Sequence, residues 1–117
     1  MVQIMELPSF KDSRGSLTVI EKNLPFSIRR VYYIHDTNEL PRGGHAHRVG
    51  QQALICLHGE CAVHVKTEND HQTFLLNIPQ QCLLLEPNEW HSITFEPGSI
   101  LLVLASIYYS ANNYTYD

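Results

Sequence analysis

The sequence of 117 residues predicts a single all-β domain, built as a sandwich or a closed barrel. Three observations lead to this fold class. Short runs rich in Val, Ile, Leu, Thr and aromatic residues recur along the chain, separated by turn-forming residues. The six prolines lie near the ends of these runs, where they do not interrupt a central strand. No segment of useful length shows the period of an amphipathic helix.

Ten candidate strands follow one another from the N-terminus, each rich in β-branched, leucine or aromatic residues. They span residues 2–7, 16–21, 28–35, 44–48, 51–57, 60–66, 72–77, 82–86, 91–96 and 100–107. Turn residues, mainly Gly, Pro, Asn and Asp, separate them at 12–15, 40–44, 58–59, 68–70, 78–80, 87–88 and 97–98. The tail 108–117 has room for one turn of helix. No linker or repeat divides the chain, so residues 1–117 are expected to form one domain.

Composition limits the classes of partner. Apolar residues make up 44% and charged residues 17%, as in a folded soluble protein. The net charge of −4 argues against general nucleic-acid binding, and an anionic small ligand would need a local cluster of arginines. The start of the chain, 1–6, has neither the basic residues nor the apolar run of a signal peptide, and no stretch is long enough to span a membrane. We therefore expect a cytoplasmic protein with no nucleic-acid or membrane partner.

Cysteine usage agrees with that location. Cys56, Cys61 and Cys82 are odd in number and lie inside apolar strand patterns. None has the paired short spacing of a zinc or redox site. Buried free thiols in a reducing compartment are the expected outcome.

The most informative stretch is Pro-Arg-Gly-Gly-His-Ala-His-Arg at residues 41–48. Strand side chains alternate between faces, so His45 and His47 project from the same face. Two neighbouring imidazoles can hold a metal or pass protons near neutral pH. The glycines before them let the backbone come close to a ligand.

Later residues extend this pattern. Gln52 follows the histidine pair, Gly59 comes after six further residues, and His91 follows a proline turn. This order resembles the cupin motifs, which implies a jelly-roll barrel with an interior pocket. A glutamate of the first cupin motif is replaced here by Gln52. An amide offsets less of a dication's charge than a carboxylate does, so we expect no metal and no other cofactor. Histidine acid–base chemistry is the expected alternative.

Four ordered segments narrow the resemblance. They are 12–17, 25–34, 41–47 and 104–109, and they are similar to the sugar-nucleotide 3,4-ketoisomerases, the FdtA/QdtA or WxcM-like cupins. The similarity runs from about residue 8 to residue 116. It implies a homodimer whose substrate is a dTDP-linked 4-keto-6-deoxyhexose. The reaction would move the carbonyl from C4 to C3 through an enediol, without a redox cofactor.

The resemblance and this chemistry suggest roles for the site residues. His47 is our candidate for the base at C3 and His45 for the partner that handles the second proton, although this order could be reversed. Arg42 is a candidate partner for an anion or enediolate. Gln52 and His91 are expected to orient the sugar from the pocket wall.

Two further assignments are for substrate binding. Tyr32 and Tyr33 must point to opposite faces of their strand, and the resemblance favours Tyr33 as the one that reaches the sugar. The resemblance also implies that Arg14, in the Asp-Ser-Arg-Gly turn, binds the diphosphate, because related sugar-nucleotide cupins place an arginine in a similar turn. A guanidinium suits phosphate through two parallel hydrogen bonds. Arg30 and Arg48 are weaker candidates for the same task.

Three other functions remain open from the sequence. A 3,5-epimerase acting on the same class of sugar would also remove a proton beside a ketone. A metal-dependent cupin oxygenase would use the same histidines as ligands. A non-catalytic module that binds sugar nucleotides would present the same residues without turnover.

Overall fold

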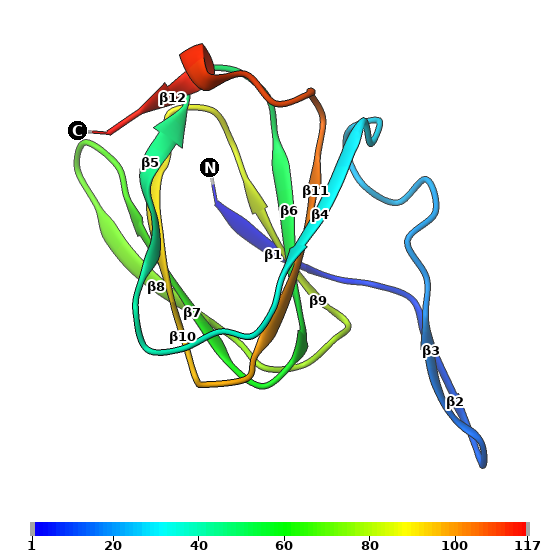
Figure 1. Cartoon of the computed structure of the whole chain (residues 1–117). Helices are drawn as coiled ribbons and strands as arrows, with labels where there is room; N and C mark the ends of the chain where they lie inside the picture. Colours follow the sequence, from blue (N-terminus) through cyan, green and yellow to red (C-terminus); the bar gives the residue numbers. More distant parts are fainter. Residues whose placement is uncertain (1, 117) are drawn as a thin grey trace.

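Two five-stranded antiparallel sheets face one another in the computed structural model, which describes residues 2–116 (Figure 1). The first sheet has the order β1-β9-β6-β11-β4 and the second β12-β5-β10-β7-β8. The strands are β1 (Gln3–Glu6), β2 (Ser9–Asp12), β3 (Gly15–Thr18), β4 (Arg30–Ile34), β5 (Arg42–His47), β6 (Gln52–His58), β7 (Cys61–Lys66), β8 (His71–Leu76), β9 (Gln81–Leu85), β10 (Trp90–Phe95), β11 (Ile100–Ala105) and β12 (Tyr114–Thr115). A 3-10 turn, η1 (Ala111–Asn113), precedes β12. Within the described residues, no helix has the length and hydropathy to cross a membrane.

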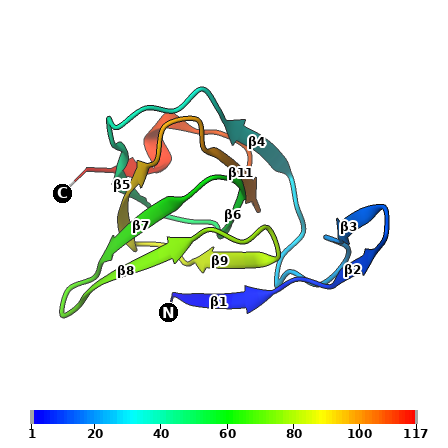
Figure 2. The same ribbon diagram turned by 90° about the horizontal axis from the view of Figure 1, so that it is seen from below.

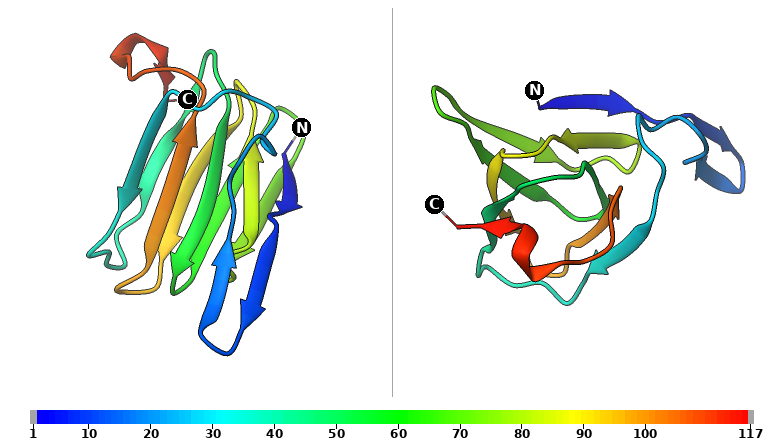
Figure 3. Two further views of the ribbon diagram at one scale, coloured as in Figure 1. Left: turned by 90° about the vertical axis from the view of Figure 1, so that its right-hand side faces the viewer. Right: turned by 90° about the horizontal axis from the view of Figure 1, so that it is seen from above.

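The chain passes repeatedly from one sheet to the other, as in a jelly roll. From β4 to β7 every strand lies in the sheet opposite to its predecessor, and the same holds from β8 to β12. Figure 2 and the right-hand view of Figure 3 look along the strands and show them surrounding a common interior. The predicted all-β jelly-roll fold is confirmed.

Strand β6 shows how the core is arranged. Leu54 and Cys56 face the second sheet and belong to the cluster between the layers. Ala53 and Ile55 face the other way and belong to a second cluster. That cluster is covered by Ile20, Leu24 and Phe26, from the segment between β3 and β4. Because both faces of β6 are buried, its sequence is a nearly continuous apolar run rather than an alternating one.

All ten predicted strands overlap strands of the structure, and two strands were not predicted. β2 escaped notice because its residues are largely polar and all exposed. β12 has only two residues, too few for a periodic signal. The single helical turn expected in the tail is η1. The three cysteines are buried and free, as expected.

The hairpin of β2 and β3 stands apart from the sandwich. It projects to one side of the molecule in Figure 1 and in the left-hand view of Figure 3. Its strands pair only with each other, and Asp12 faces Gly15 across the tip. Phe10 and Leu17 are 64% and 61% exposed on it. The hairpin therefore carries apolar surface that this chain does not bury.

Neighbouring leucines on β8 provide a test of the layer arrangement. Leu76 is fully buried between the sheets, whereas Leu75 is 49% exposed on the outer face. We expect Leu76→Ala to lower the free energy of unfolding by about 2–5 kcal/mol, because it leaves a cavity in the core. Leu75→Ala should stay within about 0.5 kcal/mol of the parent. Urea unfolding measures both, and equal losses would contradict this assignment of faces.

Candidate active site

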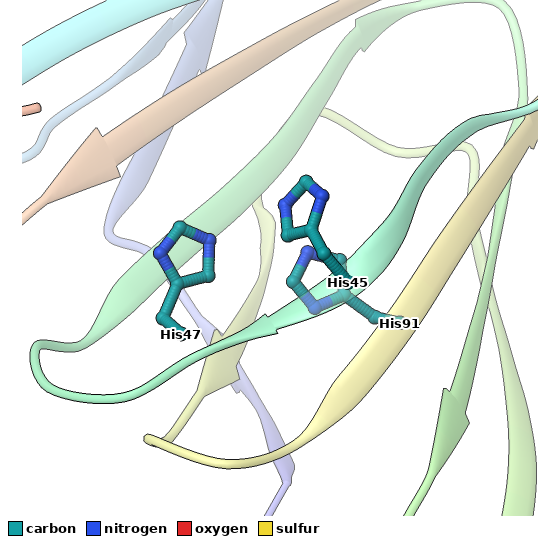
Figure 4. A group of neighbouring side chains, drawn as sticks. All are labelled: His45, His47 and His91. Atoms are coloured by element: carbon teal, nitrogen blue, oxygen red, sulfur yellow. The ribbon is translucent and has the colours of Figure 1, made fainter. Parts of the chain in front are cut away.

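Three imidazoles meet where β5 pairs with β10. His45 lies opposite His91 in the antiparallel register, and their ring centroids are 5.1 Å apart. His47 is two residues further along the same face of β5, with its ring centroid 5.1 Å from that of His45. Figure 4 shows the three rings gathered on one side of these strands. The alternation of strand side chains, which predicted that His45 and His47 share a face, is confirmed.

A glycine allows this close pairing. Gly43 has a φ of +87°, and a Cβ there would lie 2.9 Å from the backbone oxygen of His91. The register shifts between His91 and Ser92 at this point, which marks a bulge. Any larger residue at position 43 would push β5 away from β10 and separate His45 from His91.

His45 and His91 border a cavity of about 430 Å³. Its size lies in the range of small-molecule sites. The lining residues are Arg30, Tyr32, Tyr33, Ile34, His35, Arg42, Gly43, His45, Gln52, Leu54, His91, Ile93, Val103 and Tyr114. None of these lining residues is acidic, and two are arginines. The cavity therefore favours anions, although the chain as a whole is negatively charged.

Gln52 and Tyr32 form one wall of the cavity. The Gln52 side chain is buried, and its Nε2 donates a hydrogen bond of 3.5 Å to the Tyr32 hydroxyl. The guanidinium of Arg30 lies over the Tyr32 ring, 4.4 Å from its centroid. Burial raises the pKa of Tyr32, so its hydroxyl stays protonated and can donate a hydrogen bond.

Tyr32 and Tyr33 differ in burial and packing. Both residues border the cavity, but Tyr33 is 64% exposed and its ring packs beside His35. Tyr32 instead packs against the core cluster between the sheets. On β4 the inward positions are Arg30, Tyr32 and Ile34, so the Tyr32 side chain points into the barrel.

Burial favours the neutral form of all three imidazoles. Burial, together with a smaller effect of the neighbouring His45, lowers the pKa of His91 to about 4 against the opposing hydrogen bond to the Glu89 backbone. Burial, then His91, His45 and Arg30, lower the pKa of His47 to about 4. The pKa of His45 is also lowered by burial, and the Gly43 backbone opposes the shift. At neutral pH all three rings can act as bases or hydrogen-bond donors without a proton being removed first.

The structure brings most of the predicted site residues together. His45, Arg42, Gln52 and His91 line the cavity directly. His47 lies at the end of this group, between His45, His91 and the C-terminal segment.

Arg14 does not belong to this group. It lies at the tip of the projecting hairpin, where its side chain is 89% exposed and pairs with Asp12. In this chain Arg14 is outside the cavity.

Sequence reasoning undervalued one residue and missed two. The sequence favours Arg14 over Arg30 as the diphosphate ligand, yet Arg30 is the one that borders the cavity. Its guanidinium lies over the rings of Tyr32 and Tyr109. Tyr114 packs against both His45 and His47, with ring centroids 4.6 Å away in each case. Asn113 lies behind His47. No sequence signal marks the C-terminal pair, because only the pairing of β12 with β5 brings them to the histidines.

The imidazoles could also hold a metal ion. One nitrogen from each of His45, His47 and His91 lies within 4.8 Å of the other two. Neutral imidazole is a common ligand of divalent transition metals. Gln52 lines the same cavity with a neutral amide, and no carboxylate is among the lining residues. The donor set therefore supplies less charge compensation than a carboxylate-containing site would.

A jelly-roll barrel with inward histidines from the motif strands defines the class of protein as a cupin. Within that class the family is clear. The family described as "WxcM-like, C-terminal" (FdtA) matches residues 1–117, and the chain belongs to it.

Members of this kind are similar to the chain both in sequence and in structure. The chain is 44% identical over 116 residues to a TDP-4-oxo-6-deoxy-alpha-D-glucose-3,4-oxoisomerase of Aneurinibacillus thermoaerophilus, covering 96% of this chain and 84% of the relative. A 3,4-ketoisomerase from Helicobacter canadensis superposes with a TM-score of 0.95 at 38% identity, covering 99% of this chain and 90% of that one. The sugar 3,4-ketoisomerase QdtA from Thermoanaerobacterium thermosaccharolyticum, solved with TDP, gives 0.95 at 35% identity, covering 99% and 88%.

The likeness to epimerases is weaker. A dTDP-4-dehydrorhamnose 3,5-epimerase from Bacillus anthracis superposes with a TM-score of 0.86 at 16% identity, covering 98% of this chain and 77% of that one. At that identity the likeness shows the fold alone.

Buried neutral histidines make stability depend on pH. The pKa values of His47 and His91 fall to about 4 in the folded chain, below the unperturbed value of about 6.5. Between these values the unfolded chain binds more protons, so the stabilising contribution is complete above about pH 6.5 and is lost as the pH falls towards 4. We expect the free energy of unfolding, measured with urea, to decrease from pH 7 to pH 5.

The double variant His47→Gln/His91→Gln serves as the comparison, since it removes both titrating groups. Its unfolding free energy should change less over the same pH interval. An equal slope in the parent and the double variant would show that these histidines titrate normally.

Proposed function

We propose that this chain is a 3,4-ketoisomerase that acts on a dTDP-linked 4-keto-6-deoxyhexose. The observation that carries the proposal is the cavity in which facing imidazoles, His45 and His91, lie beside two arginines and no acid. The 44% identity to a TDP-4-oxo-6-deoxy-glucose 3,4-oxoisomerase supports the same reaction. The neighbouring ketoisomerase solved with TDP supports a thymidine nucleotide as the carrier.

The chemistry needs only proton transfers. The C4 ketone acidifies the hydrogen on C3, and a base removes that proton to give an enediolate. A proton is then delivered to the C4 carbon while the proton of the C3 hydroxyl passes to the C4 oxygen, which leaves a carbonyl at C3 and a hydroxyl at C4. Negative charge develops on the sugar oxygens in the intermediate, so fixed hydrogen-bond donors and cations beside them lower the barrier.

His45 is the base and His47 the donor in this proposal, which reverses the order favoured from the sequence. His45 lines the cavity and is less buried than the other two imidazoles, so it keeps more of its basicity. In His91 the Nδ1–H donates a hydrogen bond of 3.1 Å to the Glu89 carbonyl, which leaves Nε2 as an acceptor for a sugar hydroxyl.

The remaining wall residues bind and polarise the sugar. Arg30 and Arg42 supply positive charge for the enediolate and for the diphosphate that follows the sugar. The hydroxyl of Tyr32 and the amide of Gln52 hold the sugar oxygens. No step in this scheme requires a metal or an organic cofactor.

A homodimer completes the proposal. The hairpin of β2 and β3 carries exposed Phe10 and Leu17 away from its own sandwich. If the hairpin packs on a second copy, these side chains become buried and Arg14 is delivered to that copy. This arrangement gives Arg14 the diphosphate role that it cannot fill in its own chain.

Three buried thiols support a cytoplasmic enzyme, because a reducing compartment preserves them.

Proton NMR of the sugar nucleotide tests the reaction directly. Incubation of dTDP-4-keto-6-deoxyglucose with the protein in deuterated buffer containing EDTA should give the 3-keto product with deuterium at C4. His45→Gln should reduce the rate by about 10²–10⁴-fold, because a positioned base is lost. Circular dichroism confirms that the variant is folded.

The alternative functions give different spectra. Deuterium at C3 and C5 with the carbonyl still at C4 would identify an epimerase. Activity that appears only after EDTA is replaced by a divalent metal would identify a metal-dependent cupin. An unchanged sugar at high protein concentration, with binding intact, would identify a binding module.

The hairpin prediction concerns assembly. We expect the parent chain to sediment as a dimer in analytical ultracentrifugation and Phe10→Asp/Leu17→Asp to sediment as a monomer, because charges replace the apolar contact. Leu75→Asp, which places a charge on a comparably exposed leucine of β8, should remain dimeric. A dimer that survives the hairpin substitutions would place the interface elsewhere.

A further inference from the structure

Asn113 is a buried asparagine whose side chain faces a candidate catalytic histidine. Only 7% of the residue is exposed. It ends η1, immediately before β12 pairs Tyr114 with His47. Its Nδ2 lies 3.5 Å from Nδ1 of His47. Because this asparagine is buried and held in place, the orientation of its amide affects His47.

The backbone of Val49 fixes which end of the amide faces His47. The Val49 N–H donates to Oδ1 of Asn113 at 2.9 Å, and Nδ2 of Asn113 donates to the Val49 carbonyl at 3.0 Å. A flipped amide would place two donors together and two acceptors together, which costs both hydrogen bonds. The atom beside His47 is therefore the nitrogen, whose second hydrogen is free to point at the ring.

The segment around Asn113 is tied to the histidine strand by further bonds. The Arg48 N–H donates to the Asn113 carbonyl at 2.8 Å, and the Arg48 Nε–H donates to the Asn112 carbonyl at 3.1 Å. The Asn113 N–H donates to the Ser110 carbonyl at 3.1 Å. Asn113 cannot easily turn away from His47, so its amide acts as a fixed donor.

A fixed donor at Nδ1 determines the tautomer of the imidazole. In a neutral ring one nitrogen carries the hydrogen and the other accepts. A hydrogen on Nδ1 would point at the amide N–H of Asn113, so Nδ1 is the acceptor and Nε2 carries the hydrogen. In Figure 4 one ring nitrogen of His47 faces His45, on the side away from the strand that carries it. The Nε2–H is thus presented to the space shared with His45 and His91.

We infer that Asn113 is a positioning residue that holds His47 as its Nε2–H tautomer, so that His47 serves the reaction as a hydrogen-bond donor and not as the base. This inference rests on the proposed isomerase function and adds a residue to it. The Nε2–H of His47 donates to the sugar oxygen at C4 as the enediolate forms, while His45 takes the proton from C3. A donor already in place needs no reorientation when the charge develops.

Nitrogen NMR of the ligand-free protein tests the tautomer without reference to activity. In histidine-labelled parent protein, the long-range proton–nitrogen correlations of His47 should show a protonated Nε2 and an unprotonated Nδ1. Asn113→Asp keeps an acceptor for the Val49 N–H but replaces the donor with a carboxylate, so Nδ1 of His47 should become protonated. A parent His47 with its hydrogen on Nδ1 would overturn the inference.

Kinetics with a matched control test the consequence. Asn113→Asp should lower kcat about 10–100-fold with little change in KM. Losses of this size are expected when the hydrogen-bond partner that orients an active-site imidazole is altered. Asn112→Asp introduces the same charge one residue earlier, at an exposed side chain, and should behave as the parent. Parent-like kcat in Asn113→Asp would overturn the inference.

Two substitutions of His47 leave Asn113 unchanged. They test whether His47 acts as a hydrogen-bond donor or as the base, even if Asn113→Asp does not fold. Glutamine places its amide N–H near the position of Nε2, whereas asparagine reaches only the position of Nδ1. His47→Gln should retain at least about 10-fold more activity than His47→Asn, since an amide can replace a donor but not a base. The same exchange at His45 should give no such rescue.

The outcomes separate this inference from the proposed function. A parent protein that does not isomerise the sugar nucleotide contradicts the proposed function, while its NMR spectrum still reports the tautomer. A parent protein that turns over normally, with His47→Asn equal to or better than His47→Gln, contradicts the role of Asn113 alone.

Discussion

The close antiparallel pairing of β5 and β10 is the constraint on which the site depends. It places His45 opposite His91, and it is possible only because Gly43 lacks a Cβ where the His91 carbonyl approaches. Each strand by itself would present one or two imidazoles to solvent. Paired at this bulge, the two strands bring one nitrogen of each of the three imidazoles within 4.8 Å of the others.

Enclosure changes the chemistry of these side chains. Removing imidazoles from water disfavours their charged forms, and their proximity adds mutual repulsion, so the pKa values of His47 and His91 fall to about 4. Arg30 and Arg42 border the same cavity, and no acidic residue is among those that line it. The result is a set of neutral proton carriers beside fixed positive charge. This combination suits an anionic enediolate intermediate better than a reaction that needs a charged histidine at the outset.

Two segments outside the main strands complete the site in different ways. The C-terminal segment folds back onto β5, where Tyr114 covers His45 and His47 and Asn113 holds the far side of His47. The hairpin of β2 and β3 leaves the sandwich and exposes apolar side chains. The first segment orients a side chain within the chain, and the second is suited to reach a second copy. The sandwich provides the scaffold for both.

The sequence by itself determined the all-β class, the ten main strands and the shared face of His45 and His47. These features depend on local alternation and on turn residues, which are readable without tertiary contacts. The resemblance to the cupin motifs implied that Gln52 and His91 lie in the pocket, and both line the cavity. The hairpin tip at residues 12–15 was also correctly identified as a turn.

Tertiary structure decided the rest. Alternation gives the period of β4 but not its phase, so only packing shows that Tyr32, not Tyr33, faces the interior. The turn that contains Arg14 can be predicted from its residue types. The distance of Arg14 from the cavity cannot, because it depends on the direction in which the hairpin projects. Asn113 reaches the site through a two-residue strand that pairs with a segment more than sixty positions earlier. Such contacts have no local signature, because the partner that gives the residue its role is supplied by the fold.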